Sequence, residues 1–197
     1  KGGSTVTVKW DGAPAIFCGI NPENGKFFVG TKSIFNKSPK INYTNADISR
    51  NHGGQLADKL KVALRYLPKL GIKGILQGDL LFTSDDKKTA TVDGKKSIIF
   101  TPNTITYAVP VNSDIGKRIA RAKMGIVFHT SYSGKTMDKL SASFGTVRGS
   151  SNRNVFLASA GYKETAVMFS KSELSKFDAQ IRICLLYTSD AADEDLR

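Results

Sequence analysis

One segment of the chain has the spacing of a long amphipathic helix, and this segment most strongly limits the possible folds. Its apolar residues recur every three or four positions, at Leu56, Leu60, Ala63, Leu64 and Leu67. This spacing places them on one face of a helix over Gln55–Leu67. Pro68 and Gly71 follow and end the pattern, because proline cannot continue a helix and glycine favours its C-terminal cap.

The segments around this helix have the character of strands. Short β-branched or apolar stretches occur at 5–9, 15–19, 26–31, 74–82, 98–100, 105–111 and 125–129. Asn21-Pro22-Glu23-Asn24-Gly25 is rich in turn formers, so a hairpin is expected around it. We expect 74–82, 98–100 and 105–111 to be central strands. Hairpins without regular strand–helix alternation predict an α+β domain with a mainly antiparallel sheet and packed helices.

Three other segments complete the expected organisation. A second helix is predicted over 114–122, where Asp114 lies near the start and Lys117, Arg118 and Arg121 lie toward the end. Residues 36–54 are rich in Asn, Ser, Lys and Gly and are expected to form a surface loop with one helical turn near Ala46. Residues 133–154 are expected to be an exposed basic excursion, and 164–175 to return to ordered structure.

The composition favours a basic, intracellular globular domain. The 197 residues are 40% hydrophobic and have a formal net charge of +12, which favours an anionic partner, nucleic acid above all, over a solvated basic surface. Cys18 and Cys184 are too few for a disulfide framework or a cysteine zinc site. No stretch approaches the ~20 apolar residues of a membrane span. We expect a soluble, monomeric, cytoplasmic protein with no membrane partner.

Both ends of the chain predict a fragment. The chain begins with Lys1 rather than methionine and enters a strand pattern within a few residues. Residues 184–197 look like translated sequencing-adapter read-through at the end of an environmental gene fragment; the alternative is a short acidic helix at a genuine C-terminus. We therefore expect residues 1–181 to be one domain that is truncated at both ends.

The tetrapeptide Lys9-Trp10-Asp11-Gly12 is the first candidate for chemistry. A lysine attacks phosphorus only when part of its population is neutral, which requires a shielded site or neighbouring positive charge. Gly12 would let the backbone approach a phosphate closely, and Asp11 could accept hydrogen bonds that hold the loop. The alternative is a surface lysine beside an ordinary Asp-Gly turn, since so short a motif also arises by chance.

This tetrapeptide resembles motif I of the covalent nucleotidyltransferase superfamily, which comprises ATP-dependent DNA and RNA ligases and mRNA capping enzymes. Gly74-Ile75-Leu76-Gln77-Gly78-Asp79-Leu80 is similar to motif III, with Asp79 at the acidic position. Phe28-Val29-Gly30-Thr31-Lys32 resembles the segment that presents an arginine, here replaced by Lys32. Tyr107 lies in the segment that resembles the family's base-stacking strand; the alternative is a core aromatic.

Some features depart from the family pattern. Gly12-Ala13-Pro14 stands where many DNA ligases have Gly-x-Arg, and Met124 stands where motif IV has a carboxylate. The metal ligands are therefore left unassigned, and motifs IV and V are expected in a C-terminal part beyond this chain. Lys163 and Lys171 are candidate motif V lysines without a supporting pattern. His52 and His129 have no partner at a diagnostic spacing.

The resemblance implies an incomplete, ATP-grasp-like adenylation domain of a phage-like polynucleotide ligase. In that activity Lys9 takes AMP from ATP with Mg²⁺ and passes it to a 5′-phosphate, which is then sealed to a 3′-hydroxyl. Asp11, Gly12, Lys32, Asp79 and Tyr107 would bind the nucleotide. RNA and DNA ends remain equally open as substrates. The alternatives are a GTP-using capping-type enzyme and a non-catalytic, viral nucleic-acid-binding protein.

Overall fold

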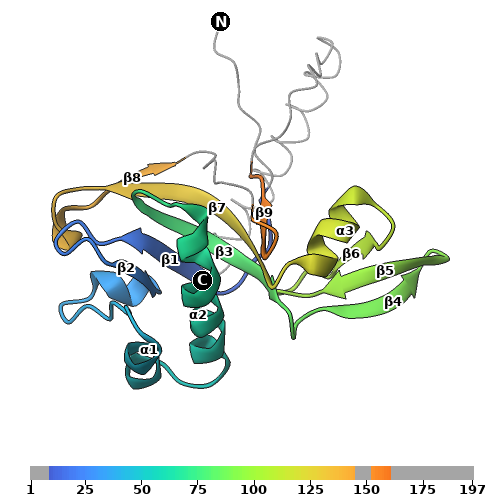
Figure 1. Cartoon of the computed structure of the whole chain (residues 1–197), viewed down its shortest axis with the longest axis horizontal. Coiled ribbons are helices and arrows are strands. Elements are labelled where there is room, and N and C mark those ends of the chain that lie inside the picture. The colour runs from blue at the N-terminus through green and yellow to red at the C-terminus, as the bar shows by residue number, and fades with distance from the viewer. Residues whose placement is uncertain (1–8, 145–151, 161–197) are drawn as a thin grey trace, which may run out of the picture. The chain divides into compact units, whose positions relative to one another are not determined.

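The computed structural model describes residues 9–144 and 152–160, which form two sheets with helices packed against them (Figure 1). Within these residues the larger sheet has the strand order β2-β1-β3-β7-β8, and β9 pairs with β7 beside this path. Its strands are β1 (Ala15–Ile20), β2 (Phe27–Gly30), β3 (Ile75–Thr83), β7 (Met124–Ser133), β8 (Ser141–Phe144) and β9 (Val155–Ala158). All pairings are antiparallel except β7 with β9, so the predicted α+β class with mainly antiparallel sheets is confirmed.

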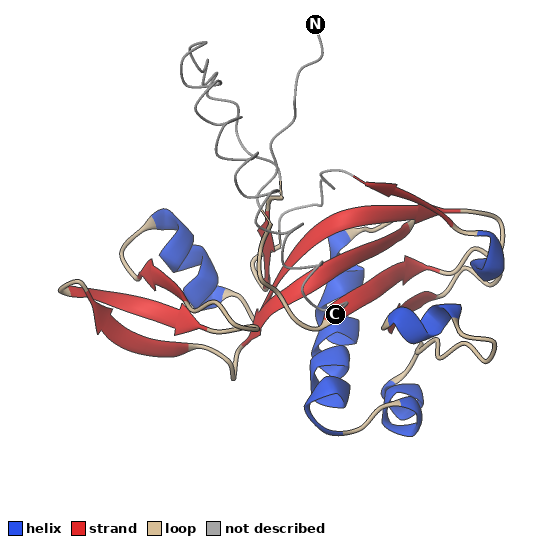
Figure 2. Ribbon diagram, turned by 180° about the vertical axis from the view of Figure 1, so that it is seen from behind, coloured by secondary structure: helices blue, strands red, loops and turns tan. Residues whose placement is uncertain are grey.

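The predicted amphipathic helix is α2 (Gly54–Tyr66), and it covers one face of the larger sheet. In Figure 2 this helix passes behind the strands. Its buried residues Ala57, Leu60 and Ala63 pack in one core with sheet residues, among them Ile16, Leu76, Leu80 and Ile126. The 3-10 turn η2 (Leu67–Leu70) follows, and Gly71 ends it with a φ of 66°, a left-handed conformation that glycine adopts without steric cost.

The opposite face of the larger sheet has a polar strip between two apolar clusters. Phe17 and Ile75 belong to one cluster, and Leu81 and Val127 belong to the other. Between them, Asp79 lies opposite Val127, and Gln77 lies opposite Thr130. Directly opposed residues in a sheet point to the same side, so these polar side chains share one face with both clusters.

The smaller sheet is formed by β4 (Lys88–Val92), β5 (Lys95–Phe100) and β6 (Tyr107–Pro110), in that order. Helix α3 (Asp114–Arg121) confirms the predicted second helix. Its buried Ile119 belongs to the same apolar cluster as Ile98 and Phe100 of β5. Ser113 caps the helix by accepting a hydrogen bond from Gly116 N at 2.9 Å.

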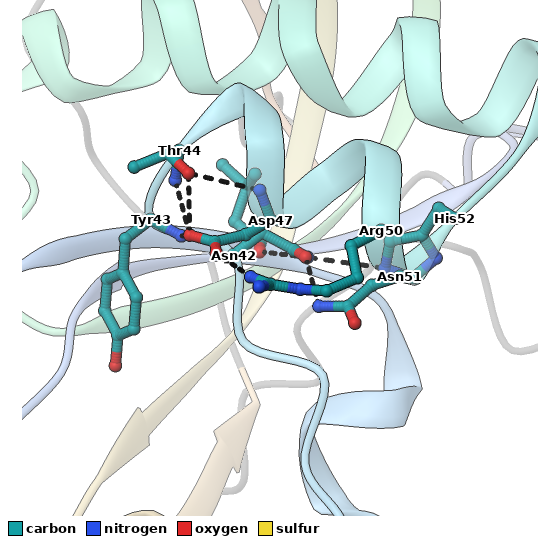
Figure 3. Close-up of polar contacts among 8 residues, drawn as sticks. Asn42, Tyr43, Thr44, Asp47, Arg50, Asn51 and His52 are labelled. Atoms are coloured by element: carbon teal, nitrogen blue, oxygen red, sulfur yellow. Dashed lines mark hydrogen bonds and ion pairs between the residues drawn. The ribbon is translucent and has the colours of Figure 1, made fainter.

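Helix α1 (Asn45–Asn51) confirms the helical turn predicted near Ala46, and it is longer than the single turn expected within the loop over 36–54 (Figure 3). Thr44 accepts a hydrogen bond from Asp47 N at 3.1 Å, and the Asp47 carboxylate accepts one from Thr44 N at 3.0 Å. This reciprocal pair is a capping box, which satisfies two orphan donors and starts the helix. Asp47 also pairs with Arg50 one turn later.

Several other predictions are confirmed or need correction. The prediction of central strands is confirmed for 74–82, which corresponds to β3, and for 98–100, which lies in β5 between β4 and β6. Segment 105–111 contains β6, which is an edge strand of the smaller sheet, so the prediction of a central strand is wrong there. β7 continues well past residue 129. The excursion at 133–154 contains the 3-10 turn η3 (Met137–Lys139) and β8. Residues 5–8, 145–151, 164–175 and 184–197 lie outside the described residues, so expectations for them stay predictions.

Candidate functional site

The Lys9–Gly12 loop is held directly against β3. Ala13 N donates to Leu80 O at 2.9 Å, and Leu80 N donates to Pro14 O at 3.1 Å. A Cβ added to Gly12 would lie only 2.5 Å from the Asp79 Cβ, which is closer than carbon atoms pack. Glycine is therefore required at position 12 for the approach of this loop to Asp79.

Asp11 fastens the same loop to the segment before β6. Its carboxylate accepts four hydrogen bonds of 2.7 to 2.8 Å, from Asn103 Nδ2, Thr104 N, Thr104 Oγ1 and Ile105 N. These donors stabilise the ionised form and hold the pKa of Asp11 well below its usual range, the Asn103 bond having the largest effect. The carboxylate holds the loop, as its place beside Gly12 predicted.

Lys9 lies three residues before Gly12, which packs against Asp79. Lys9 is exposed, and its positive charge acts on the Asp79 carboxyl. Burial raises the pKa of Asp79, and the Asp11 charge adds to this effect; His129 and Lys9 oppose it. Two residues that lie 70 positions apart in the sequence thus share one electrostatic environment. A half-buried carboxyl with a raised pKa beside an exposed amine is a candidate functional site.

His129 joins this pair, although no spacing in the sequence indicated it. Its Nε2 lies 3.6 Å from Asp79 Oδ1, and its Nδ1 lies 2.8 Å from Thr130 Oγ1. Gly78 lies opposite Phe128 and Gln77 lies opposite Thr130, so His129 is the extra residue of a β-bulge. A bulge re-aims a side chain, and only the pairing register of β3 and β7 reveals this one.

Tyr107 contacts the loop, but its ring is packed between other aromatic rings. Its centroid lies 5.4 Å from that of Trp10 and 5.4 Å from that of Phe100, and its hydroxyl accepts a hydrogen bond from Asp11 N at 2.8 Å. Trp10 in turn donates from Nε1 to Ser159 O at 3.0 Å. In this structure Tyr107 helps to fix the Lys9 loop, and the proposed role as a base platform stays a prediction.

Lys32 lies at the same end of the larger sheet without a described contact to Asp79. In β1, Phe17 pairs with Gly30 of β2, and Ala15, two residues before Phe17, pairs with Asp79 of β3. Lys32 then begins the 3-10 turn η1 (Lys32–Phe35) and is exposed. Register therefore places Lys32 just after the end of β2, with β1 between that strand and the strand that carries Asp79.

An aromatic group beside this site was missed by the sequence analysis. The rings of Phe17, Phe35 and Tyr132 pack with centroid distances of 5.3 to 5.7 Å, and Phe35 is 42% exposed. Tyr132 also donates from its hydroxyl to Gln77 Oε1 at 2.7 Å. Phe17, Phe35, Tyr132 and Gln77 come from four separate segments, so no local sequence pattern predicts that they pack together.

The remaining candidates separate into those outside the site and those outside the described residues. Met124 is fully buried, and Lys163 and Lys171 lie outside the described residues. His52 lies at the end of α1, where Asn42 Nδ2 is 3.3 Å from its Nε2, and burial together with Lys40 lowers its pKa. In 9–144 and 152–160, no three His, Cys, Asp or Glu side chains form a group that could hold a metal ion.

None of the helices in the described part of the chain has the length and apolar content that a membrane crossing needs. Among comparisons with known proteins, the model of a family of unknown function, DUF6267, matches residues 1–194. No curated protein and no solved structure matches the chain.

Proposed function

The chain belongs to DUF6267, a family of unknown function, and we propose that this member is an ATP-dependent polynucleotide ligase that forms a covalent lysyl-AMP at Lys9. The observation that supports the proposal best is the contact of the Lys9–Gly12 loop with Asp79, where a Cβ on Gly12 would meet Asp79 Cβ at 2.5 Å. The two segments that resemble motifs I and III thus lie against each other. We further propose that this fold is an ATP-grasp-like adenylation domain.

The proposed reaction proceeds in three balanced steps. Lys9 Nζ, after losing its proton to solvent, attacks the α-phosphorus of ATP; an N–P bond forms and the P–O bond to pyrophosphate breaks. An oxygen of a 5′-phosphate then attacks the same phosphorus; a P–O bond forms, the N–P bond breaks and the lysine nitrogen takes up a proton from solvent, which gives an adenylylated end and the free lysine. Finally a 3′-hydroxyl loses its proton, attacks the 5′-phosphorus and expels AMP, which leaves a phosphodiester.

Asp79 is the residue that fits a bound Mg²⁺. This ion is usually held by one or two carboxylates together with substrate phosphates and water, so a single half-buried carboxylate is compatible with it. The Asp11 carboxylate is already engaged by four donors and is not available. When bound, Mg²⁺ would neutralise charge on the phosphoryl oxygens.

Covalent labelling of the longest natural form of the protein with α-labelled ATP and Mg²⁺ tests the proposal. Label that is stable in denaturant and released by acid is expected on the wild type and not on Lys9→Ala. Lys26→Ala is the matched control, because Lys26 is an equally exposed lysine beside the turn before β2. Addition of a 5′-phosphorylated nicked duplex or RNA should then discharge the label.

Each other outcome points to a different function. Label from GTP and not from ATP would replace the ligase by a capping-type nucleotidyltransferase. Label that persists in Lys9→Ala would move the nucleophile elsewhere. The absence of label with both nucleotides would overturn the enzymatic proposal and favour a non-catalytic nucleic-acid-binding protein.

A further inference from the structure

Three arginines from two distant segments line one cavity beside α3. The cavity has a volume of about 290 Å³, and its described lining includes Arg118, Arg121 and Arg153, with Asn152 and Phe156 between them. The three arginines are exposed, whereas Phe156 is 7% exposed. The Arg118 guanidinium lies 5.2 Å from the Phe156 ring centroid, so packing against an aromatic face orients it.

These arginines have no carboxylate partner among the described residues. The ion pairs of this part of the chain join other groups, such as Lys117 with Asp114 at the far end of α3. Three uncompensated guanidinium groups around one hollow create a positive potential. Guanidinium presents a planar fork of donors that matches the paired oxygens of a phosphate or a carboxylate, so a cluster of three arginines suits an oxyanion that carries several charges.

The carbonyl groups at the C-terminal end of α3, beside the cavity, are neutralised by a lysine. Free carbonyl groups at the end of a helix carry partial negative charge and would repel a phosphate. Here Lys87 Nζ donates to Ile119 O at 2.9 Å, Ala120 O at 3.2 Å and Ala122 O at 2.7 Å. The ammonium therefore offsets the charge of these carbonyls beside the cavity.

Strand β9 connects this cavity to the Lys9 loop. Phe156 lines the cavity, and Ser159 O, just after the strand, accepts the hydrogen bond from Trp10 Nε1. Three residues of extended chain span roughly 10 Å. A row of packed rings also joins the two places, from Trp10 through Tyr107, Phe100 and Phe82 to Phe156.

We propose that the Arg118–Arg121–Arg153 cavity binds backbone phosphates of the polynucleotide whose end is joined at Lys9. The identification of the bound strand as the one joined at Lys9 rests on the proposed function. The expectation that the cavity binds phosphate groups rests on its three arginines alone. The short connection through β9 would place the bound phosphates on the same strand as the reacting end. Part of the basic net charge of the chain would thus lie on a defined nucleic-acid contact surface.

Salt-dependent binding of a fluorescent, 20-nucleotide single-stranded oligonucleotide, as DNA and as RNA, tests the inference. Each phosphate contact contributes about 0.7 to the slope of log K against log salt for single strands, so Arg118→Gln/Arg121→Gln/Arg153→Gln should lower the slope by about 2. Affinity at 0.1 M salt should fall roughly 100-fold by the same relation. Lys37→Gln/Lys73→Gln/Lys88→Gln removes equal charge from exposed positions on other segments and should leave the slope near that of the wild type.

Equal losses in the two triple variants would overturn the inference, because they would indicate diffuse electrostatics rather than a site. Wild-type binding to vesicles of anionic lipid, with no binding to the oligonucleotide, would also overturn it. Selective loss in the arginine variant supports the cavity even if the wild type takes no label from ATP, an outcome that removes only the ligase proposal. If the triple arginine variant binds the oligonucleotide as the wild type does, while the wild type is labelled at Lys9, only the proposal for the cavity is overturned.

Discussion

Replacing Gly12 with alanine tests whether the approach of the Lys9 loop to Asp79 is as close as the structure places it. The added Cβ would lie 2.5 Å from Asp79 Cβ and 3.0 Å from Leu80 O, whereas carbon atoms pack at about 3.5 to 4.0 Å. The loop must therefore retreat by about 1 Å. The hydrogen bond from Ala13 N to Leu80 O, now 2.9 Å, would lengthen beyond bonding range.

Overpacking of this kind lowers the free energy of unfolding by about 1 to 3 kcal/mol. For a domain of this size that corresponds to a fall in Tm of about 2 to 12 °C. The effect on covalent labelling should be larger, since a misplacement of about 1 Å can reduce a reaction rate on the order of 100-fold. Thermal unfolding and the initial rate of label transfer from ATP measure the two effects.

Gly53→Ala is the matched control, because nothing lies within 4 Å of its added Cβ and its φ is −121°. Gly53 is the N-cap of α2, where alanine is less favourable than glycine, so this variant should lose at most about 1 kcal/mol of stability. Its rate of labelling should equal that of the wild type. The Asp79→Gly background removes the Asp79 Cβ and should reduce the stability cost of Gly12→Ala. An equal cost in both backgrounds, or a Gly12→Ala protein that matches Gly53→Ala in both assays, would refute the reasoning.

Two further predictions follow from Asp79 and from the start of α1. Burial raises the pKa of Asp79 in the folded protein, so the protonated carboxyl stabilises the fold fully below the ordinary pKa of 3.8, and this stabilisation is lost as pH rises through the raised folded value. Asp79→Asn, which is neutral at every pH, should therefore have a higher Tm than the wild type at pH 7, and the difference should shrink toward pH 4. The rate of label transfer from ATP should fall in the same variant. An Asp79→Asn gain that is constant with pH would contradict this account. Thr44→Ala should lower the free energy of unfolding in urea by about 1 kcal/mol, because the capping box of α1 is broken. Thr44→Ser keeps the hydroxyl and should retain most of the wild-type stability. Equal losses in the two variants would show that the cap contributes little.

The sequence predicted those parts of the fold that depend on local pattern. The apolar spacing of 55–67 predicted α2 to within a residue at each end, and the turn formers at 21–25 predicted the β1–β2 hairpin. Two local signals were present and were overlooked. Thr44 and Asp47 have the spacing of a capping box, and Asp93-Gly94 is a hairpin turn with both φ angles positive.

The rest of the site depends on register and packing, which no single segment encodes. His129 reaches Asp79 only because β7 contains a bulge opposite Gln77 and Gly78. Arg118 and Arg153 line one cavity only because β9 pairs with β7. The proximity of Lys9 to Asp79 was anticipated from a resemblance, whereas the glycine contact that produces it required coordinates.

The hydrogen bond between Trp10 and Ser159 has a consequence for the order of events during synthesis. The two residues are 149 positions apart, and Asp11 and Tyr107 are 96 positions apart. At about 5 to 20 residues per second, the ribosome adds the Ser159 partner roughly 7 to 30 s after Trp10. The Lys9 loop is thus synthesised well before its partner at Ser159, so we expect nascent chains that stop before β9 to lack the Trp10–Ser159 hydrogen bond.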